Sequence, residues 1–273
     1  MIKIEGEILD KLQAIELEML VEVDRICRKH DICYSLDGGT LLGAVRHDGF
    51  IPWDDDADVV MLREEYNKFF EVCKRELDTD RFFLQEYRTD TEYRWGYSKL
   101  RRNGTIFLRE GQECIKCNQG VFIDIFVYDN VPDLWLSRRL HLFACFCIRK
   151  GLYSKVGKFQ TKNKLIRALY TVLEKVPRDK WFEYIEKIAT RTNRKQSELV
   201  RHMTYPYRWG QSRYGLPRKC FSEFIDKEFE GRQFRVFKEY DLYLSKLYGN
   251  YMDLPPIEKR ITHPVSKIHL IDI

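Results

Sequence analysis

One stretch of the chain, residues 35–62, decides the fold: SLDGGTLLGAVRHDGFIPWDDDADVVML. The apolar run over 32–36 predicts a short strand, and the glycines at 38 and 39 predict a sharp turn after it. Thr40 can cap the helix that follows, because a threonine hydroxyl accepts hydrogen bonds from the free amides of a first helical turn. The run over 56–62 predicts a second strand. A strand, a glycine turn, a helix and an acidic strand in this order indicate an α/β fold.

The segments on either side extend this arrangement. Apolar residues recur at three- and four-residue steps from 5 to 30, which predicts a long amphipathic helix. The other predicted elements are a helix over 64–77, strands over 97–101 and 121–128, a mainly helical region over 134–198, a strand over 229–236, a short helix over 240–248 and an extended tail. The fold class is therefore α/β (or α+β), with a mixed sheet core flanked by helices and a helical addition. We divide the chain into a core (1–130), a helical lobe (131–200) and a C-terminal segment that packs back on the core (201–273).

The composition is that of an ordinary globular protein. The 273 residues are 44% hydrophobic and 33% charged, which argues against disordered, collagen and coiled-coil classes. The net charge of +5 is small for this length, so we expect no nucleic-acid partner. The N-terminal residues differ from a secretory signal, and we expect a cytoplasmic protein with free thiols at its eight cysteines. Cys114 and Cys117 have zinc-knuckle spacing, but no second pair completes four ligands.

Four carboxylates crowd into five positions at the start of the acidic strand: Asp54, Asp55, Asp56 and Asp58. Like charges this close repel in a partly buried site, so the fold needs a compensating cation. Asp56 and Asp58 share one face of the strand, since side chains alternate. Asp124 stands alone in the apolar run 121–127 and also needs a partner. We expect Asp56, Asp58 and Asp124 to hold Mg²⁺ or Mn²⁺, which prefer oxygen ligands. The alternatives are a solvated acidic turn and a buried Asp124–arginine pair.

Phosphate-binding groups are predicted beside the carboxylates. Gly38, Gly39 and Thr40 leave backbone amides free at a helix N-terminus, where the helix dipole favours phosphate oxygens. A Gly-Gly pair is also common in ordinary tight turns. Four further side chains could bind a second phosphate: Arg46, His47, Lys99 and Arg101. A solvated surface charge is the competing interpretation for each of them.

The stretch from Ser35 to Asp58 resembles the signature of the LicD family of phosphotransferases. The resemblance continues at four further places: Met61, Tyr66, FIDIF over 122–126 and YGNYM over 248–252. It implies a nucleotidyltransferase-like core that transfers a phosphorylated alcohol, typically phosphocholine, from a CDP-linked donor such as CDP-choline to a sugar hydroxyl, releasing CMP. Asp56, Asp58 and Asp124 would be its catalytic and metal-holding residues. The implied acceptor is a cell-surface glycan precursor, such as a teichoic acid or a lipopolysaccharide, on a lipid carrier or free.

Several points stay open within this resemblance. The general base is Asp124 or, in reserve, Asp54. Aromatic faces commonly hold a quaternary ammonium group, and two sets could do so here: Tyr93, Trp95 and Tyr97, or Tyr207 and Trp209. A nucleotidyltransferase that transfers the nucleotide itself would use the same residues but would release pyrophosphate. A non-catalytic glycan-binding protein would not need all three carboxylates.

The helical region also carries a pattern typical of membrane contact. The apolar run over 140–148 is about half the length of a membrane span, so it is not transmembrane. The cations that bracket it are Arg138, Arg139, Arg149 and Lys150, and a basic amphipathic helix follows over 164–176. Two interpretations remain: a lobe over 135–175 that meets the inner face of the membrane, or helices that only cover the core.

Overall fold

The computed structural model describes residues 2–206 and 213–272. Its seven helices in this part of the chain are α1 (Glu7–Lys29), α2 (Gly38–Arg46), α3 (Arg63–Glu76), α4 (Trp135–Gln160), α5 (Lys164–Leu173), α6 (Arg178–Thr192) and α7 (Tyr240–Tyr248). Two short 3-10 helices cover Arg218–Phe221 and Ile257–Lys259. The strands are β1 (Ser35–Leu36), β2 (Asp58–Leu62), β3 (Phe82–Gln85), β4 (Ser98–Arg102), β5 (Ile106–Arg109), β6 (Phe122–Val131), β7 (Leu199–His202), β8 (Leu216–Pro217), β9 (Phe224–Phe229), β10 (Arg232–Phe237) and β11 (Val265–His269). The expected α+β class is confirmed.

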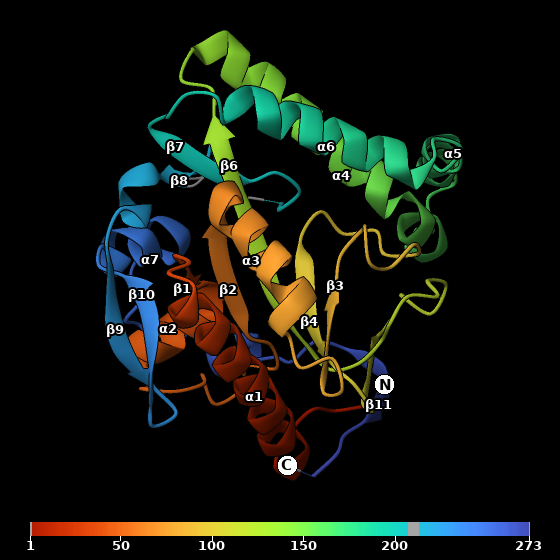
Figure 1. The fold of residues 1–273 in the computed structure, drawn as a ribbon. Coiled ribbons are helices and arrows are strands. Elements are labelled where there is room, and N and C mark those ends of the chain that lie inside the picture. The colour runs from red at the N-terminus through yellow and green to blue at the C-terminus, as the bar shows by residue number, and fades with distance from the viewer. Residues whose placement is uncertain (1, 207–212, 273) are drawn as a thin grey trace.

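The strand β6 forms the centre of a mixed sheet with the order β1-β2-β6-β4-β3. All ten of its residues are buried, as its nearly continuous apolar sequence predicts for a central strand. Its first part pairs in parallel with β2 and antiparallel with β4, and its last part pairs antiparallel with β7. The helices α1 and α3 pack against the sheet, while α4 and α6 lie over the end at which β6 meets β7 (Figure 1).

The start of α2 differs from the sequence prediction. The helix begins at Gly38, and the capping residue is Asp37, whose side chain accepts a hydrogen bond from the Gly38 amide at 2.8 Å. Thr40 lies inside the first turn, and its hydroxyl accepts a hydrogen bond from the backbone N–H of Asp58 at 2.8 Å. The assignment of Thr40 as the cap is therefore wrong. Both residue types are favourable helix caps, aspartate more so than threonine, so residue type alone did not exclude Thr40.

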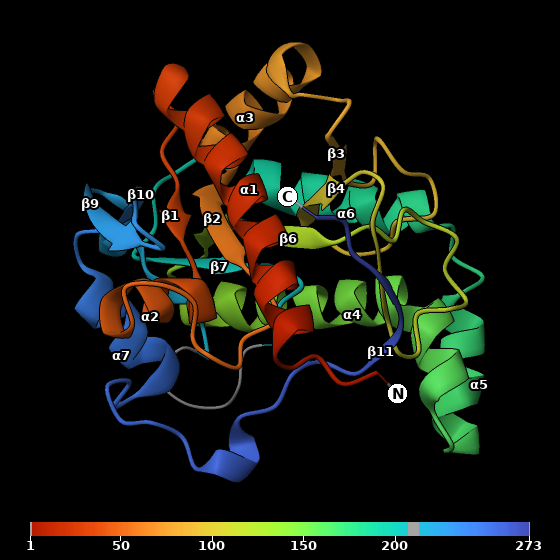
Figure 2. The ribbon, with the colours of Figure 1, turned by 90° about the horizontal axis from the view of Figure 1, so that it is seen from below.

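Three other elements differ from their predicted bounds. The strand β2 begins at Asp58 and not at Asp56, so Asp56 lies in the irregular segment that leads into it. The region around 229–236 is a hairpin of β9 and β10. The tail is not simply extended, because β11 pairs with β5. Figure 2 shows how this C-terminal segment runs back beneath the sheet beside the start of α1. The pairing of β11 with β5 joins segments that are distant in sequence, so no local pattern predicts it, whereas only Glu230 and Gly231 separate β9 from β10.

The buried apolar side chains form one large cluster around the sheet, a smaller one between α4 and α6, and a third of Ile115, Cys117 and Val156. The large cluster takes residues from the N-terminal part of the chain and from β8 to β11. The division into segments 1–130, 131–200 and 201–273 stays a prediction. All eight cysteines, including Cys114 and Cys117, are free thiols in this structure.

The buried capping residue of α2 leads to a prediction about how stability depends on pH. Burial raises the pKa of Asp37 from 3.8 to about 6, although Tyr243 and the Gly38 amide donate hydrogen bonds to its carboxylate. The native state therefore holds the proton more tightly than the unfolded chain, and the free energy of unfolding falls as pH rises from 4 to 6. Asp37→Asn keeps the acceptor oxygen without the charge. We expect it to be more stable than the wild type by about 3 kcal/mol at pH 8 and nearly equal at pH 4. Urea unfolding at both pH values checks this, and a less stable variant at pH 8 would contradict it.

Candidate active site

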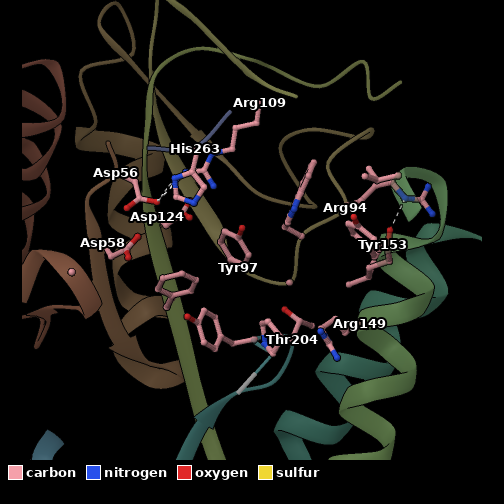
Figure 3. A pocket seen from close by; sticks show the side chains of 18 of the residues that line it. Asp56, Asp58, Arg94, Tyr97, Arg109, Asp124, Arg149, Tyr153, Thr204 and His263 are labelled. Atoms are coloured by element: carbon pink, nitrogen blue, oxygen red, sulfur yellow. Dashed lines mark hydrogen bonds and ion pairs between the residues drawn. The ribbon is translucent and has the colours of Figure 1, made fainter. Parts of the chain in front are cut away.

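A cavity of about 610 Å³ lies between the carboxylates at the start of β2 and the helix α4. Asp54, Asp56, Asp58 and Asp124 line one side of it, together with Gly39. Figure 3 shows Asp56, Asp58 and Asp124 close together on this side, with α4 on the opposite side. The three aspartates that the sequence predicts as one site are thus brought to one cavity, even though Asp56 lies outside the strand.

Strand register places Asp58, Asp124 and Lys99 side by side. Asp58 is opposite Asp124 in the parallel pair of β2 and β6, and Asp124 is opposite Lys99 in the antiparallel pair of β6 and β4. The ammonium group of Lys99 forms a buried ion pair with Asp124. Burial lowers the pKa of Lys99 to about 7, and Asp124 partly offsets this effect. The partner of Asp124 in this structure is therefore a lysine, where the sequence suggested a metal or an arginine.

Asp56 is held by two residues that sequence reasoning missed. Arg109, at the end of β5, donates a hydrogen bond from Nη2 to Asp56 Oδ2 at 2.9 Å. His263 Nδ1 is 2.9 Å from Asp55 Oδ1 and 3.7 Å from Asp56 Oδ2. Although burial opposes it, the charges of Arg109 and His263 bring the pKa of Asp56 below its ordinary value. No local signal marks either residue, because β5 and the tail reach the carboxylates only through tertiary contacts.

Asp54 and Asp58 lack such compensation. Asp58 Oδ1 is buried and has no hydrogen-bond partner among the described residues. Burial, followed by the charges of Asp56 and other carboxylates, raises the pKa of Asp58 well above its ordinary value. Burial and the charge of Asp56 raise the pKa of Asp54 in the same way. The cluster therefore holds more negative charge than its own cations balance.

The two glycines at the start of α2 bring the helix close to these carboxylates. A Cβ atom on Gly39 would lie 2.5 Å from Asp54 Oδ2, and one on Gly38 would lie 3.3 Å from Asp58 Oδ2. Gly38 also has a φ of 51°, which L side chains rarely adopt. A helix N-terminus attracts anions through its free amides. The glycines therefore keep open a narrow space between a helix N-terminus and the carboxylate cluster.

Carboxylate oxygens are the ligand type that divalent cations prefer, but these carboxylates are not arranged as a preformed metal site. Among the described residues, no group of three or more His, Cys, Asp or Glu side chains is placed to hold a metal ion. Asp56 is engaged by Arg109, and Asp124 is engaged by Lys99. The unpartnered oxygen of Asp58 and the excess negative charge fit a hard cation. The predicted Mg²⁺ or Mn²⁺ site stays a prediction.

The predicted phosphate-binding residues are dispersed. Gly39 lines the main cavity, and Gly38 lines a second cavity that also contacts Asp58. Arg101 is buried and donates to Gln85 Oε1 at 2.7 Å, and Arg46 donates to the carbonyl oxygen of Tyr251 at 2.7 Å. Six residues of the predicted set are absent from the lining of the main cavity: Gly38, Thr40, Arg46, His47, Lys99 and Arg101. Lys99 likewise reaches the cavity only through Asp124. Their binding of phosphate stays a prediction.

Aromatic side chains form much of the remaining cavity wall. Trp95 and Tyr97 line it, as do Tyr205 and Tyr248, which the sequence analysis did not single out. Tyr93 is fully buried beneath Trp95. The alternative pair, Tyr207 and Trp209, lies outside the described residues.

Comparison with known proteins identifies the family of this chain. A family described as "LicD/FKTN/FKRP, nucleotidyltransferase domain" matches residues 31–135. The chain is 33% identical over 276 residues to the lipopolysaccharide cholinephosphotransferase LicD of Haemophilus influenzae, and the match covers 96% of this chain and 98% of that protein. The chain belongs to the LicD family. The resemblance inferred from residues 35–58 is thereby confirmed.

Two shorter matches involve uncharacterized proteins. RT0683 of Rickettsia typhi is 38% identical over 55 residues, which is 20% of this chain and 18% of that protein. RP689 of Rickettsia prowazekii is 42% identical over 48 residues, which is 18% of each. The LicD domain match itself includes the carboxylates, Lys99 and Arg109. The cavity wall formed by α4, Tyr205, Tyr248 and His263 lies beyond it.

The different surroundings of Asp56 and Asp58 predict opposite effects on stability. Asp58→Asn removes an uncompensated buried charge, so we expect a free energy of unfolding roughly 1 kcal/mol higher at pH 8. Asp56→Asn leaves Arg109 partly buried without its partner, so we expect a decrease of about 1–3 kcal/mol. Chemical unfolding in chelator-treated buffer measures both effects. Equal changes in the two variants would contradict the assigned ion pairs.

Proposed function

We propose that this protein transfers phosphocholine from CDP-choline to a hydroxyl group of a cell-surface glycan precursor, such as lipopolysaccharide, and releases CMP. The observation that carries the proposal is the match along 96% of the chain to a protein named as a lipopolysaccharide cholinephosphotransferase. The cavity supports it, because carboxylates and a helix N-terminus meet at one side and aromatic rings line the wall.

Each group of residues has a role in this proposal. The amides at the start of α2, next to Gly38 and Gly39, bind phosphate oxygens of the donor. Asp56, Asp58 and Asp124 hold Mg²⁺, which neutralises the phosphate charge when it is bound. The aromatic faces of Trp95, Tyr97, Tyr205 and Tyr248 are suited to the quaternary ammonium of choline.

The proton of the attacking hydroxyl needs an acceptor. The sequence left Asp124 and Asp54 as candidates. Asp124 already accepts the charged hydrogen bond of Lys99, which weakens it as a base. Asp54 lines the cavity, and its raised pKa makes its carboxylate the stronger base. We propose Asp54 as the group that removes the proton.

The function is tested by incubating the protein with CDP-choline, Mg²⁺ and a lipopolysaccharide acceptor that lacks phosphocholine. We expect release of CMP together with transfer of choline phosphate to the acceptor. Asp58→Asn and Asp124→Asn should lower the rate by roughly 100-fold or more, because the phosphate charge loses its compensation. Asp80→Asn is the matched control, since Asp80 is exposed and does not line the cavity.

Other outcomes separate the alternatives. Release of pyrophosphate from CTP with attachment of the nucleotide would show a nucleotidyltransferase. Glycan binding without any turnover would show a non-catalytic binding protein. Full activity in the presence of a chelator would contradict the proposed requirement for a metal ion.

We also propose peripheral contact with the inner face of the membrane, through the exposed apolar stripes of α4 and α5. No helix in the described residues is long and apolar enough to span a membrane. Each of the two helices nevertheless exposes apolar side chains at the spacing i, i+4 and i+7: Leu136, Leu140 and Phe143 in α4, and Leu165, Leu169 and Val172 in α5. Phe143 is 66% exposed and Leu165 is 82% exposed, which is unusual for large apolar residues.

The cations that the sequence suggested for membrane contact lie in different surroundings. Arg149 and Lys150 line the cavity, and Arg138 donates hydrogen bonds to the carbonyl oxygens of Pro132 and Asp133. Among the described residues, the exposed cations over 135–175 are Arg139, Lys162, Lys164, Arg167 and Lys175. Each cation held near an anionic membrane surface contributes about 1 kcal/mol, so a few of them give reversible binding.

Sedimentation with vesicles tests the membrane contact. We expect binding to vesicles that contain phosphatidylglycerol, and weak binding to neutral phosphatidylcholine vesicles or at high salt. The double variant Lys162→Glu/Lys164→Glu and the variant Phe143→Ser should each reduce binding at least several-fold. Lys267→Glu, an exposed change in β11, is the control. Equal binding to anionic and neutral vesicles would contradict the proposal.

A further inference from the structure

The side of the cavity opposite the carboxylates is basic. Arg94 comes from the loop before β4, and Arg149 and Lys150 come from the middle of α4. Figure 3 shows Arg94 and Arg149 across the cavity from Asp56, Asp58 and Asp124. The cavity therefore has an acidic end and a basic end, and the aromatic wall lies between them.

The cations of the basic end lack acidic partners. Arg94 Nε donates to the carbonyl oxygen of Leu152 at 3.0 Å, but Arg94 Nη2 is buried without a hydrogen-bond partner among the described residues. Lys150 donates to the hydroxyl of Tyr170 at 3.1 Å. In the part of the chain that the structure describes, no ion pair involves Arg94, Arg149 or Lys150. The two glutamates whose charges act on Arg94 are themselves paired, Glu92 with Lys155 and Glu174 with Lys158.

Partial burial of a cation without a partner raises the free energy of the folded state, because the charge loses hydration. An anion bound beside the cation offsets this loss. Burial lowers the pKa of both Arg94 and Arg149, in accordance with their incomplete compensation. Guanidinium groups bind phosphate and carboxylate in a two-pronged geometry, so two arginines suit a phosphate monoester or a carboxylate.

The donor does not supply this anion if the proposed function holds. The only anionic groups of CDP-choline are its two phosphates, and these are required at the carboxylate end, where the bond is broken. One end of the donor is a neutral cytidine, and the other is a quaternary ammonium that a basic surface repels. An anion at the basic end therefore belongs to the second substrate.

We propose that Arg94, Arg149 and Lys150 bind an anionic group of the acceptor, a phosphate or a carboxylate, and that this contact orients the acceptor hydroxyl towards the carboxylate end. The inference rests on the proposed function. It makes the acceptor an acidic sugar or a sugar on a lipid phosphate, and it makes α4 part of acceptor recognition. The three residues are binding residues and take no part in bond making.

The test uses matched soluble acceptors: one sugar with a phosphate monoester, the same sugar without it, and the same sugar linked through phosphate to a short lipid. We expect the wild type to have a lower KM for both phosphate-bearing acceptors than for the neutral one. Arg94→Gln and Arg149→Gln should raise that KM at least 10-fold and should raise the KM for the neutral sugar by a much smaller factor. A preference for the lipid-linked acceptor alone would assign the anion to the lipid carrier, and a preference for both would assign it to any phosphate.

Arg191→Gln is the matched control, because Arg191 is exposed on α6 and does not line the cavity. Melting temperatures of all variants verify folding. A similar KM for phosphorylated and neutral sugars in the wild type, or equal losses with both in the variants, would overturn the inference.

Calorimetric titration of the phosphorylated sugar, without a donor, separates this inference from the proposed function. Binding that Arg94→Gln weakens at least 10-fold would support the anion site even if CDP-choline were not turned over. Turnover of CDP-choline without any dependence on the phosphate of the acceptor would leave the function standing and overturn the anion site.

Discussion

The register between β2 and β6 holds the site together. It sets Asp58 beside Asp124, and the pairing of β6 with β4 then sets Lys99 beside Asp124. Side chains alternate along a strand, so a shift of one residue would send Asp124 to the opposite face of the sheet. The register is maintained by buried apolar pairs that follow the aspartates, such as Val59 with Ile125. The apolar core and the acidic site are therefore specified by the same pairing.

The charges around the cavity explain why a folded protein tolerates this cluster. Arg109 and Lys99 neutralise Asp56 and Asp124, but Asp54 and Asp58 remain uncompensated. The cluster therefore contains two carboxylates that are paired with cations and two that are not. On the opposite side of the cavity, the arginines of the basic end carry positive charge that no acidic side chain among the described residues balances. If the two substrates carry charges complementary to the two ends of the cavity, both ends attract them, and this favours one orientation of binding.

The sequence predicted the parts of this site that depend on local pattern. The crowding of carboxylates before an apolar run and the single aspartate inside a buried strand pointed to Asp56, Asp58 and Asp124. Long-range contacts were not predictable in this way. Arg109 and His263 look like ordinary charged residues in a strand and a tail, and Arg149 looked like a membrane-facing charge. The helix cap was missed for another reason, since Asp37 and Thr40 are both good capping residues and only the backbone path distinguishes them.

The pairing of β11 with β5 has a consequence for how the protein is made. His263 contacts Asp55 and Asp56, which precede it by more than two hundred residues, and β11 lies against the strand that carries Arg109. A ribosome delivers the chain from its N-terminus, so the carboxylate cluster emerges long before the segment that closes over it. The site is therefore incomplete on the nascent chain and forms only late in synthesis. The acidic side of the cavity is thus complete only when most of the chain has been made.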